Sequence, residues 1–246
     1  MALVLVTGAS TGLGLATAAE LADRGHDVVV HARASVRVDG LDILDRMRGV
    51  VLGDLADPEE TVRVAEQANA FGRFDAVVHN AGTMNDPHTM PVNVLAPYLL
   101  TASMPLPGRA VFLSSAMHLS GRPDLDPVLS GRGGSYSDSK LLITAFALAL
   151  AARHPGTRSH AVDPGWVPTR MGGSSATGDL VEGHRTQVWL ATAPEKDIEP
   201  RSGGYWHHRA VRRPHPAARD AEFQQHLLQA LHTRTGLALP DADAAG

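Results

Sequence analysis

A tyrosine and a lysine stand four residues apart in "SYSDSK" (135–140), where a long apolar helix is expected to begin. Residues at i and i+4 share one face of a helix, so Lys140 can reach the phenol of Tyr136. A phenol, with an ordinary pKa of about 10, is a poor base at neutral pH, and a nearby ammonium moves that pKa toward the working range. The pair could therefore exchange a proton with a bound substrate. The alternative is an aromatic residue at a helix start beside a surface charge.

A second chemical feature is the glycine-rich stretch "TGASTGLG" (7–14), which follows the apolar run 2–6 directly. Its glycines stand at positions 8, 12 and 14, where a missing side chain lets the backbone turn sharply and approach a ligand. The helix expected after it would present free N–H groups and its positive dipole end to a pyrophosphate. A tight strand-to-helix turn without a ligand is the alternative, but the order strand, glycine turn, helix favours a nucleotide.

Short apolar runs alternate with helical stretches along the chain. The strands are expected at 2–6, 28–31, 50–52, 76–79, 110–113 and, more weakly, 160–162. The helices are expected at 13–24, 58–71, 92–104, 136–153 and 219–234. This alternation predicts an α/β protein with a single doubly wound domain, residues 1–240, and a predominantly parallel sheet of about seven strands flanked by helices. Ligands bind such sheets beyond the carboxyl ends of the strands, and the tail 241–246 is expected to be disordered.

The composition argues against several other classes of protein. The 246 residues carry a formal net charge of −4, which gives no reason to expect a nucleic acid or an anionic membrane as partner. The basic stretch "HHRAVRRPHPAAR" (207–219) is expected to be a solvated surface arm, with a phosphate or nucleic-acid patch as the alternative. There is no cysteine, no metal-ligand spacing and no leader at the start "MALVLVTG", so we expect a cytoplasmic protein without a metal.

Further motifs follow successive expected strands: "NAG" (80–82), "SS" (114–115) and "DPGWVPT" (163–169). Together with the glycine turn and "YSDSK", they resemble the short-chain dehydrogenase/reductase family over nearly the whole chain, from Val6 to about Leu239. The long spacer 116–135 is more similar to the retinol-dehydrogenase-like branch. The resemblance implies a Rossmann-type fold and an NADP-preferring carbonyl reductase or alcohol dehydrogenase, which moves a hydride between the nicotinamide and a small-molecule carbonyl or alcohol.

The resemblance also assigns catalytic roles. Tyr136 would be the general acid or base, and Lys140 would lower its pKa and bind the nicotinamide ribose. Asn93 would hold a water in a proton relay, with a helix cap as its alternative role. Ser115, preferred to Ser114 by its position in the motif, would hydrogen-bond the substrate oxygen, with a turn residue as the alternative.

Cofactor choice depends on the end of the second strand, "VVVHARASVR". No carboxylate appears there before Asp39, and Arg33 stands where an arginine would accept a 2′-phosphate, so the resemblance favours NADP(H) over NAD(H). Thr11 weakens this preference, and Arg37 could compensate for it. Asp54 would contact the adenine, with a turn or cap as its alternative role. The full set assigned to the cofactor is Gly8, Ser10, Thr11, Gly12, Leu13, Gly14, Arg33, Asp54, Leu55, Asn80, Ala81, Gly82, Tyr136, Lys140, Pro164, Gly165, Val167 and Thr169.

The substrate side is less defined by the sequence. The spacer 116–135 is expected to be a surface loop over the site, and the glycine-rich segment of about 166–190 is expected to be a lid. His118, Trp166 and Met171 are candidates for lining the substrate pocket, although a single loop histidine is more often merely exposed.

The expected helix 136–153 is apolar over most of its circumference. Family resemblance makes a homodimer or homotetramer paired through this helix plausible, and a thick buried helix in a monomer is the alternative. Two other functions stay open: a catalytically silent nucleotide-binding sensor or scaffold with the same fold, and an isomerase or dehydratase that uses Tyr136 as a base.

Overall fold

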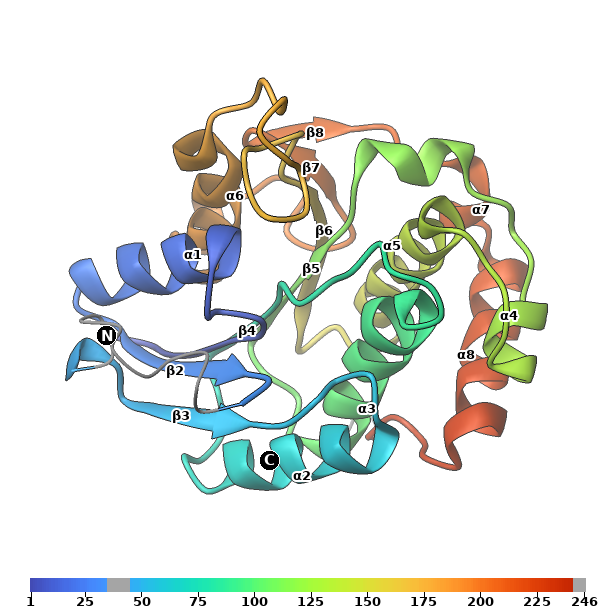
Figure 1. Cartoon of the computed structure of the whole chain (residues 1–246), viewed down its shortest axis with the longest axis horizontal. Helices are drawn as coiled ribbons and strands as arrows, with labels where there is room; N and C mark the ends of the chain where they lie inside the picture. Colours follow the sequence, from blue (N-terminus) through green and yellow to red (C-terminus); the bar gives the residue numbers. More distant parts are fainter. Residues whose placement is uncertain (35–44, 241–246) are drawn as a thin grey trace.

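A single mostly parallel sheet forms the centre of the molecule (Figure 1). The computed structural model describes residues 1–34 and 45–240; Arg37, Asp39 and the tail 241–246 lie outside these ranges. Within them the strand order is β3-β2-β1-β4-β5-β6-β7-β8, and every neighbouring pair is parallel except β7 with β8. This confirms the predicted doubly wound α/β fold, with eight strands instead of about seven. The strands are β1 Leu3–Val6, β2 Asp27–Ala32, β3 Gly49–Leu52, β4 Ala76–His79, β5 Arg109–Leu113, β6 Arg158–Asp163, β7 Tyr205–His207 and β8 Ala210–Arg212.

Helices cover both faces of the sheet (Figure 1). The longer ones are α1 Gly12–Asp23, α2 Pro58–Asn69, α3 Ala96–Ser103, α5 Tyr136–Arg153, α6 Leu180–Thr192 and α8 Ala221–Thr235; the short ones are α4 Asp126–Ser130 and α7 Pro216–Arg219. Successive residues of β1 show the two layers: Val4 and Val6 pack with α1 and α6, whereas Leu5 packs with α2 and α3. Because both faces are buried, the central strands are mostly apolar and do not alternate between apolar and polar residues.

The last two strands and α6 were missed by the sequence pattern. Most of the basic stretch 207–219 is solvent-exposed, as expected, but it is folded: it completes β7, turns at His208 and Arg209 (φ 49° and 60°) and returns as β8. Adjacent residues on a strand would point to opposite faces of the sheet. Since His208 lies in the turn, the two imidazoles instead stack with ring centroids 3.9 Å apart.

Helix α5 begins at a complete capping box. The Ser135 hydroxyl accepts the Asp138 N–H (3.1 Å), and the Asp138 carboxylate accepts the Ser135 N–H (2.8 Å). Asp138 also accepts the backbone N–H of Arg122 (2.7 Å), which ties the helix start to the spacer 116–135. These bonds satisfy helix-start donors that would otherwise lack partners and fix where the first turn of α5 lies.

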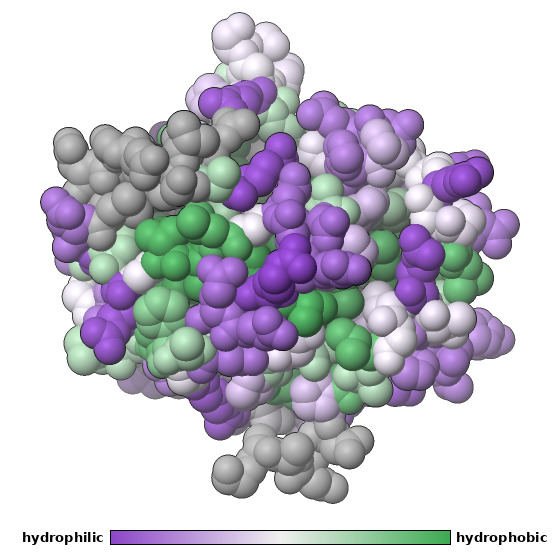
Figure 2. Space-filling model, turned by 60° about the horizontal axis from the view of Figure 1, so that its bottom comes forward, coloured by the Kyte–Doolittle hydropathy of each residue, from purple (hydrophilic) through white to green (hydrophobic). Residues whose placement is uncertain are grey.

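The apolar circumference of α5 has partners inside the same chain. Every residue from 138 to 150 is buried, against the sheet and against α7 and α8. Burial of this helix within one chain is the alternative that the sequence left open to pairing of the helix across a twofold axis. Among the described residues, no helix has the length and apolar character to cross a membrane. Figure 2 shows hydrophilic and hydrophobic side chains interspersed over one face of the molecule.

Two histidines inside the sheet are held neutral. His79 stacks on Phe112 with centroids 4.5 Å apart, and burial lowers its pKa to about 3. Burial also lowers the pKa of His160 to about 4. The His160 Nδ1 accepts the N–H groups of Gly204 (3.2 Å) and Trp206 (3.0 Å), a role that only the unprotonated nitrogen can fill.

We predict that the free energy of unfolding falls as the pH is lowered from about 6.5 toward 4. The unfolded chain binds protons on both histidines below about 6.5, whereas the folded chain does not, so stability rises with pH in this window. Each histidine contributes a slope of about 1.4 kcal/mol per pH unit. Urea unfolding between pH 4.5 and 7 measures the slope, and His79→Phe, which keeps the stacking on Phe112, should make it shallower by about one proton. An unchanged slope in that variant would contradict the assignment.

Candidate active site

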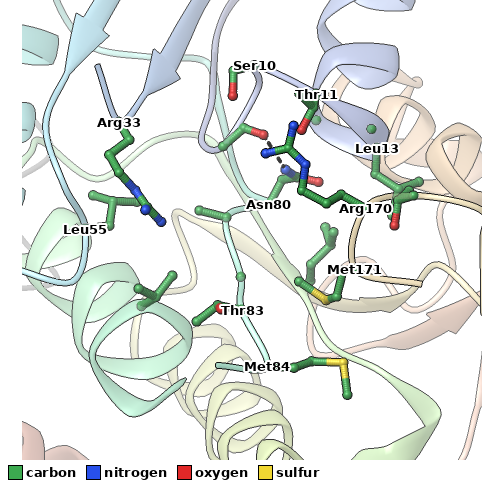
Figure 3. A pocket seen from close by; sticks show the side chains of 18 of the residues that line it. Ser10, Thr11, Leu13, Arg33, Leu55, Asn80, Thr83, Met84, Arg170 and Met171 are labelled. Atoms are coloured by element: carbon green, nitrogen blue, oxygen red, sulfur yellow. Dashed lines mark hydrogen bonds between the residues drawn. The ribbon is translucent and has the colours of Figure 1, made fainter. Parts of the chain in front are cut away.

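A cavity of about 520 Å³ opens at the carboxyl ends of the strands, between the glycine turn, the first turn of α5 and the segment 164–171 (Figure 3). It gathers most of the residues that the sequence assigned to a cofactor or substrate: Gly8, Ser10, Thr11, Gly12, Leu13, Gly14, Arg33, Asp54, Leu55, Asn80, Ala81, Gly82, Tyr136, Lys140, Pro164, Thr169 and Met171. The lining does not include Asn93, Ser115, His118, Gly165, Trp166 or Val167.

The glycine turn is built for close backbone approach. Gly8 has φ +64°, and a Cβ there would lie 2.8 Å from the Ala81 Cα. A Cβ at Gly14 would lie 2.4 Å from both the Gly8 carbonyl oxygen and the Asn80 Nδ2. Larger residues at these two positions would therefore push apart the ends of β1 and β4.

The start of α1 has the properties of an anion site. Thr11 is its N-cap, yet its side chain makes no capping hydrogen bond, and no acidic residue stands in the first turn. The first backbone N–H groups of the helix therefore point into the cavity without an intrahelical partner, at the positive end of the helix dipole. A phosphate group would satisfy them.

His31, which the sequence analysis did not single out, braces this turn. Its Nδ1 accepts the Gly8 N–H (3.1 Å), and its Nε2 donates to the Gly53 carbonyl (2.9 Å). Burial lowers the pKa of His31, so the neutral tautomer that these two bonds require is the stable form. The imidazole thus links the glycine turn to the loop that follows β3.

Arg33 and Asp54 form the far end of the cavity. The Arg33 Nε lies 3.5 Å from an Asp54 carboxylate oxygen, and the arginine side chain is 61% exposed. The other Asp54 oxygen accepts the Ala56 N–H (2.9 Å), which is the turn role considered from the sequence. Asp54 fills that role and also lines the cavity, while Asp57 caps α2.

Tyr136 and Lys140 lie together at the head of α5, with the Lys140 Nζ 5.4 Å from the phenol ring centroid. Burial raises the pKa of Tyr136 to about 12, and a hydrogen bond with the Ser115 side chain opposes this rise. Burial lowers the pKa of Lys140 to about 8. We had expected the lysine to depress the tyrosine pKa. In this state desolvation dominates both groups, and the ammonium donates to the Leu113 carbonyl (2.8 Å).

The two serines after β5 have different surroundings. Ser114 is buried and shares a hydrogen bond with Thr144 (2.6 Å), which holds its hydroxyl against α5. Ser115 accepts the Met117 N–H (3.2 Å) and has its hydroxyl beside Tyr136. Ser115 therefore fills the turn role considered as its alternative and also lies beside the tyrosine; its assignment to the substrate oxygen stays a prediction.

Asn93 lies inside a π-helical turn, Pro91–Leu95, which interrupts the helix expected at 92–104. Its side chain accepts the Thr83 N–H (2.8 Å) and donates to the Thr83 carbonyl (2.9 Å) and the Ser139 hydroxyl (3.0 Å). It is not a helix cap. The short connection from Gly82 still brings Asn93 beside α5, because a Cβ at Gly82 would lie 3.3 Å from the Asn93 oxygen and 3.5 Å from the Lys140 Nζ.

The segment 164–171 packs on the glycine turn. A Cβ at Gly12 would lie 3.2 Å from the Thr169 methyl group, so the Thr169 side chain packs against the Gly12 backbone. Within this segment the side chain of Val167 is buried and packs beside Gly183 of α6. The second half of the proposed lid, from residue 180, is the helix α6 and not a loop.

Two of the three substrate candidates lie outside the cavity. His118 is fully buried: its Nδ1 donates to the Ser115 carbonyl (2.7 Å), and its Nε2 accepts the His215 N–H (3.0 Å). Both nitrogens are therefore occupied, and the expectation of an exposed histidine was wrong. Trp166 is 56% exposed and donates to the Gly172 carbonyl (2.9 Å).

Several lining residues were not anticipated, since they carry no motif of their own. These are His31, Gly53, Thr83, Met84, Asn85, Val92, Leu113, Ser114 and Arg170. Within residues 1–34 and 45–240, no group of three or more histidine, aspartate or glutamate side chains is arranged to hold a metal ion.

Comparison with known proteins places this site in a family. The model of the short chain dehydrogenases matches residues 2–179. The chain is 35% identical over 260 residues to the short-chain dehydrogenase chyC of Penicillium rubens, with 98% of this chain and all of that protein covered. It is 27% identical over 285 residues to human retinol dehydrogenase 13, with 96% of this chain and 85% of that protein covered.

Solved structures show the same fold. A protein of unassigned function from Mycobacterium paratuberculosis superposes with a TM-score of 0.80 at 26% identity, covering 98% of this chain and 95% of the other. A short chain dehydrogenase from Shigella flexneri, solved with NADP, has a TM-score of 0.69 at 23% identity, with coverage of 85% and 97%. The chain belongs to the short-chain dehydrogenase family of oxidoreductases, and its similarity to a retinol dehydrogenase agrees with the resemblance seen in the sequence.

We predict that His31→Leu weakens NADPH binding about tenfold, because Gly8 and Gly53 each lose a hydrogen bond that fixes the turn. A fluorescence titration with NADPH measures this effect. His226→Leu, at an exposed position on α8, is the matched control and should bind like the wild type. Equal affinities in the two variants would show that the imidazole does not organise the site.

Proposed function

We propose that this protein is an NADP(H)-dependent oxidoreductase that interconverts a carbonyl compound and an alcohol. The observation that carries the proposal is the Tyr136–Lys140 pair at the head of α5, in the same cavity as a glycine turn. A proton-transfer group and a diphosphate cradle in one cavity suit a reaction in which hydride and proton reach the same substrate.

The residues present fit a dinucleotide. The diphosphate would bind at Gly12, Leu13 and the start of α1. The glycine turn has no room for side chains at Gly8 and Gly14, which keeps the backbone open to a ligand. The adenosine end would lie beside Asp54 and Leu55, and the nicotinamide end beside Pro164 and Thr169. When bound, the nicotinamide supplies or accepts the hydride.

The chain's own groups supply the proton. With its pKa raised to about 12, Tyr136 is a neutral phenol at neutral pH and can donate to the oxygen of a carbonyl as that oxygen gains negative charge. Ser115 would hydrogen-bond the same oxygen, and Asn93 would hold a water behind Lys140. In the opposite direction a charged Lys140 would stabilise the phenolate, so that Tyr136 acts as the base.

The cofactor preference rests on Arg33. Its guanidinium stands at the end of β2 beside Asp54, where a 2′-phosphate would add a second, stronger anionic partner. The NADP complex of the Shigella flexneri relative is in keeping with this choice. The substrate would bind beside Met171, under a lid formed by part of 166–190. A cytoplasmic location and assembly into a homodimer or homotetramer remain predictions of the sequence.

We predict that Tyr136→Phe retains NADPH affinity within about twofold and loses about 10²–10⁴-fold in turnover, because only the proton donor is removed. A panel of aldehydes and ketones, followed by NADPH absorbance, gives the turnover. Tyr98→Phe is the matched control: it removes a buried hydroxyl whose bond goes to the Leu237 carbonyl, remote from the site. Near-normal turnover of Tyr136→Phe would remove the tyrosine from its role.

We predict that Arg33→Asp lowers NADPH affinity about 100-fold while NADH affinity changes little or improves. The new carboxylate repels a 2′-phosphate and can accept a ribose 2′-hydroxyl. Titrations with both nucleotides test this, with Arg153→Asp, an exposed site at the end of α5, as the charge-matched control. An unaltered NADPH to NADH ratio in Arg33→Asp would overturn the assignment.

The two other functions make different predictions. A silent sensor or scaffold binds NADPH tightly yet oxidises none with any carbonyl of the panel. An isomerase or dehydratase converts its substrate with no net change in NADPH absorbance. The Tyr136–Lys140 pair favours the oxidoreductase over the sensor, since binding alone has no need of a proton donor in the cavity.

A further inference from the structure

The segment after β6 contributes an arginine that no motif anticipated. Arg170 follows Thr169, whose methyl group packs on Gly12, so its backbone lies over the glycine turn. Its side chain lines the cavity, and Figure 3 shows the guanidinium directed across it toward Thr11 and Asn80. The arginine therefore faces the start of α1 from the opposite wall.

Arg170 has no anionic partner among the described residues. Nine basic side chains of the described residues do have a carboxylate within 4.0 Å, and Arg33 is one of them, beside Asp54. Asp54 is the one carboxylate in the cavity lining, and it lies at the other end. A guanidinium carries five donors, and here they point into a cavity rather than toward a protein acceptor.

The other two basic side chains of the described cavity lining, Arg33 and Lys140, have partners elsewhere. Arg33 stands at the adenosine end, and the Nζ of Lys140 is buried against the Leu113 carbonyl and the Tyr136 ring. NADP(H) carries three phosphoryl groups, one on the ribose and two in the diphosphate. Arg170 is thus the one arginine or lysine of the described lining that is placed to meet the diphosphate.

We propose that Arg170 closes over the cofactor diphosphate, opposite the N–H groups of α1, and that the segment 164–171 is a clasp whose closing contact is this ion pair. The inference rests on the proposed dinucleotide site. The diphosphate would be bound from two sides. The N–H groups at the start of α1 bind it on one side, and the guanidinium of Arg170 makes a bidentate contact on the other. The segment would then close only on a ligand that carries a phosphate group at the start of α1.

The test compares two ligands and three variants. NADPH carries the diphosphate, whereas adenosine 2′-monophosphate carries only the phosphate assigned to Arg33. We expect Arg170→Gln to weaken NADPH binding at least tenfold and to leave binding of adenosine 2′-monophosphate within twofold. Arg33→Gln should weaken both ligands. Arg170→Lys should be intermediate for NADPH, because it retains the charge without the bidentate geometry. Isothermal titration calorimetry gives all the affinities.

The ionic-strength dependence of binding supplies a second readout. Removing one phosphate contact should make the affinity of Arg170→Gln for NADPH less sensitive to salt than that of the wild type. Arg153→Gln, at an exposed site on α5, is the matched control and should behave like the wild type for both ligands. Thermal unfolding of each variant without ligand checks that the exposed substitution leaves the fold intact.

The outcomes separate this inference from the proposed function. If wild-type protein binds neither NADPH nor adenosine 2′-monophosphate, the dinucleotide site itself is wrong. If the wild type binds NADPH and Arg170→Gln binds it equally well, the clasp is wrong while the proposed cofactor stands. If Arg170→Gln loses both ligands to the same extent, the arginine acts on the adenosine end or on the whole site, and the assignment to the diphosphate is overturned.

Discussion

The close approach of two strand ends is the constraint on which the site depends. The Gly8 backbone passes so near Ala81 that no side chain fits between them. Asn80 secures this contact by donating to the carbonyls of Thr7 (2.9 Å) and Gly8 (3.3 Å). Because β1 and β4 are parallel neighbours, their carboxyl ends meet at one edge. The turn between β1 and α1 is thereby forced to open toward the cavity.

A second constraint acts at α5, where desolvation sets the chemistry. The capping box fixes the first turn of α5, and the Lys140 side chain one turn further along is buried. Burial makes the phenol of Tyr136 a weaker acid and the ammonium of Lys140 a stronger one, so the two pKa values, about 12 and about 8, stay apart. At neutral pH the proton therefore stays on the tyrosine, and an anionic ligand nearby would raise the pKa of Lys140 and favour its charged form.

The sequence predicted what depends on local pattern and missed what depends on tertiary contact. The strands β1, β4 and β5 were evident because their residues are largely apolar and buried on both faces, and the glycine turn, NAG and SS follow them directly. The strand β7 is only three residues long and contains a histidine, so no periodicity marks it. His31 and Arg170 were missed for another reason. A histidine within a strand and an arginine after a proline-threonine pair gain a role only when the glycine turn is folded beside them.

The placement of charge in the cavity follows from these same contacts. The carboxylate of Asp54 is held by a turn and by Arg33, so it lies apart from the start of α1 and leaves that end electropositive. The ammonium of Lys140 lies beneath the tyrosine, where it donates to the Leu113 carbonyl. A helix start without an acidic side chain favours a bound anion. The segment 164–171 lies where it can cover such an anion, since Thr169 already rests on Gly12. Recognition at this end of the cavity therefore depends on the packing of one loop against one glycine.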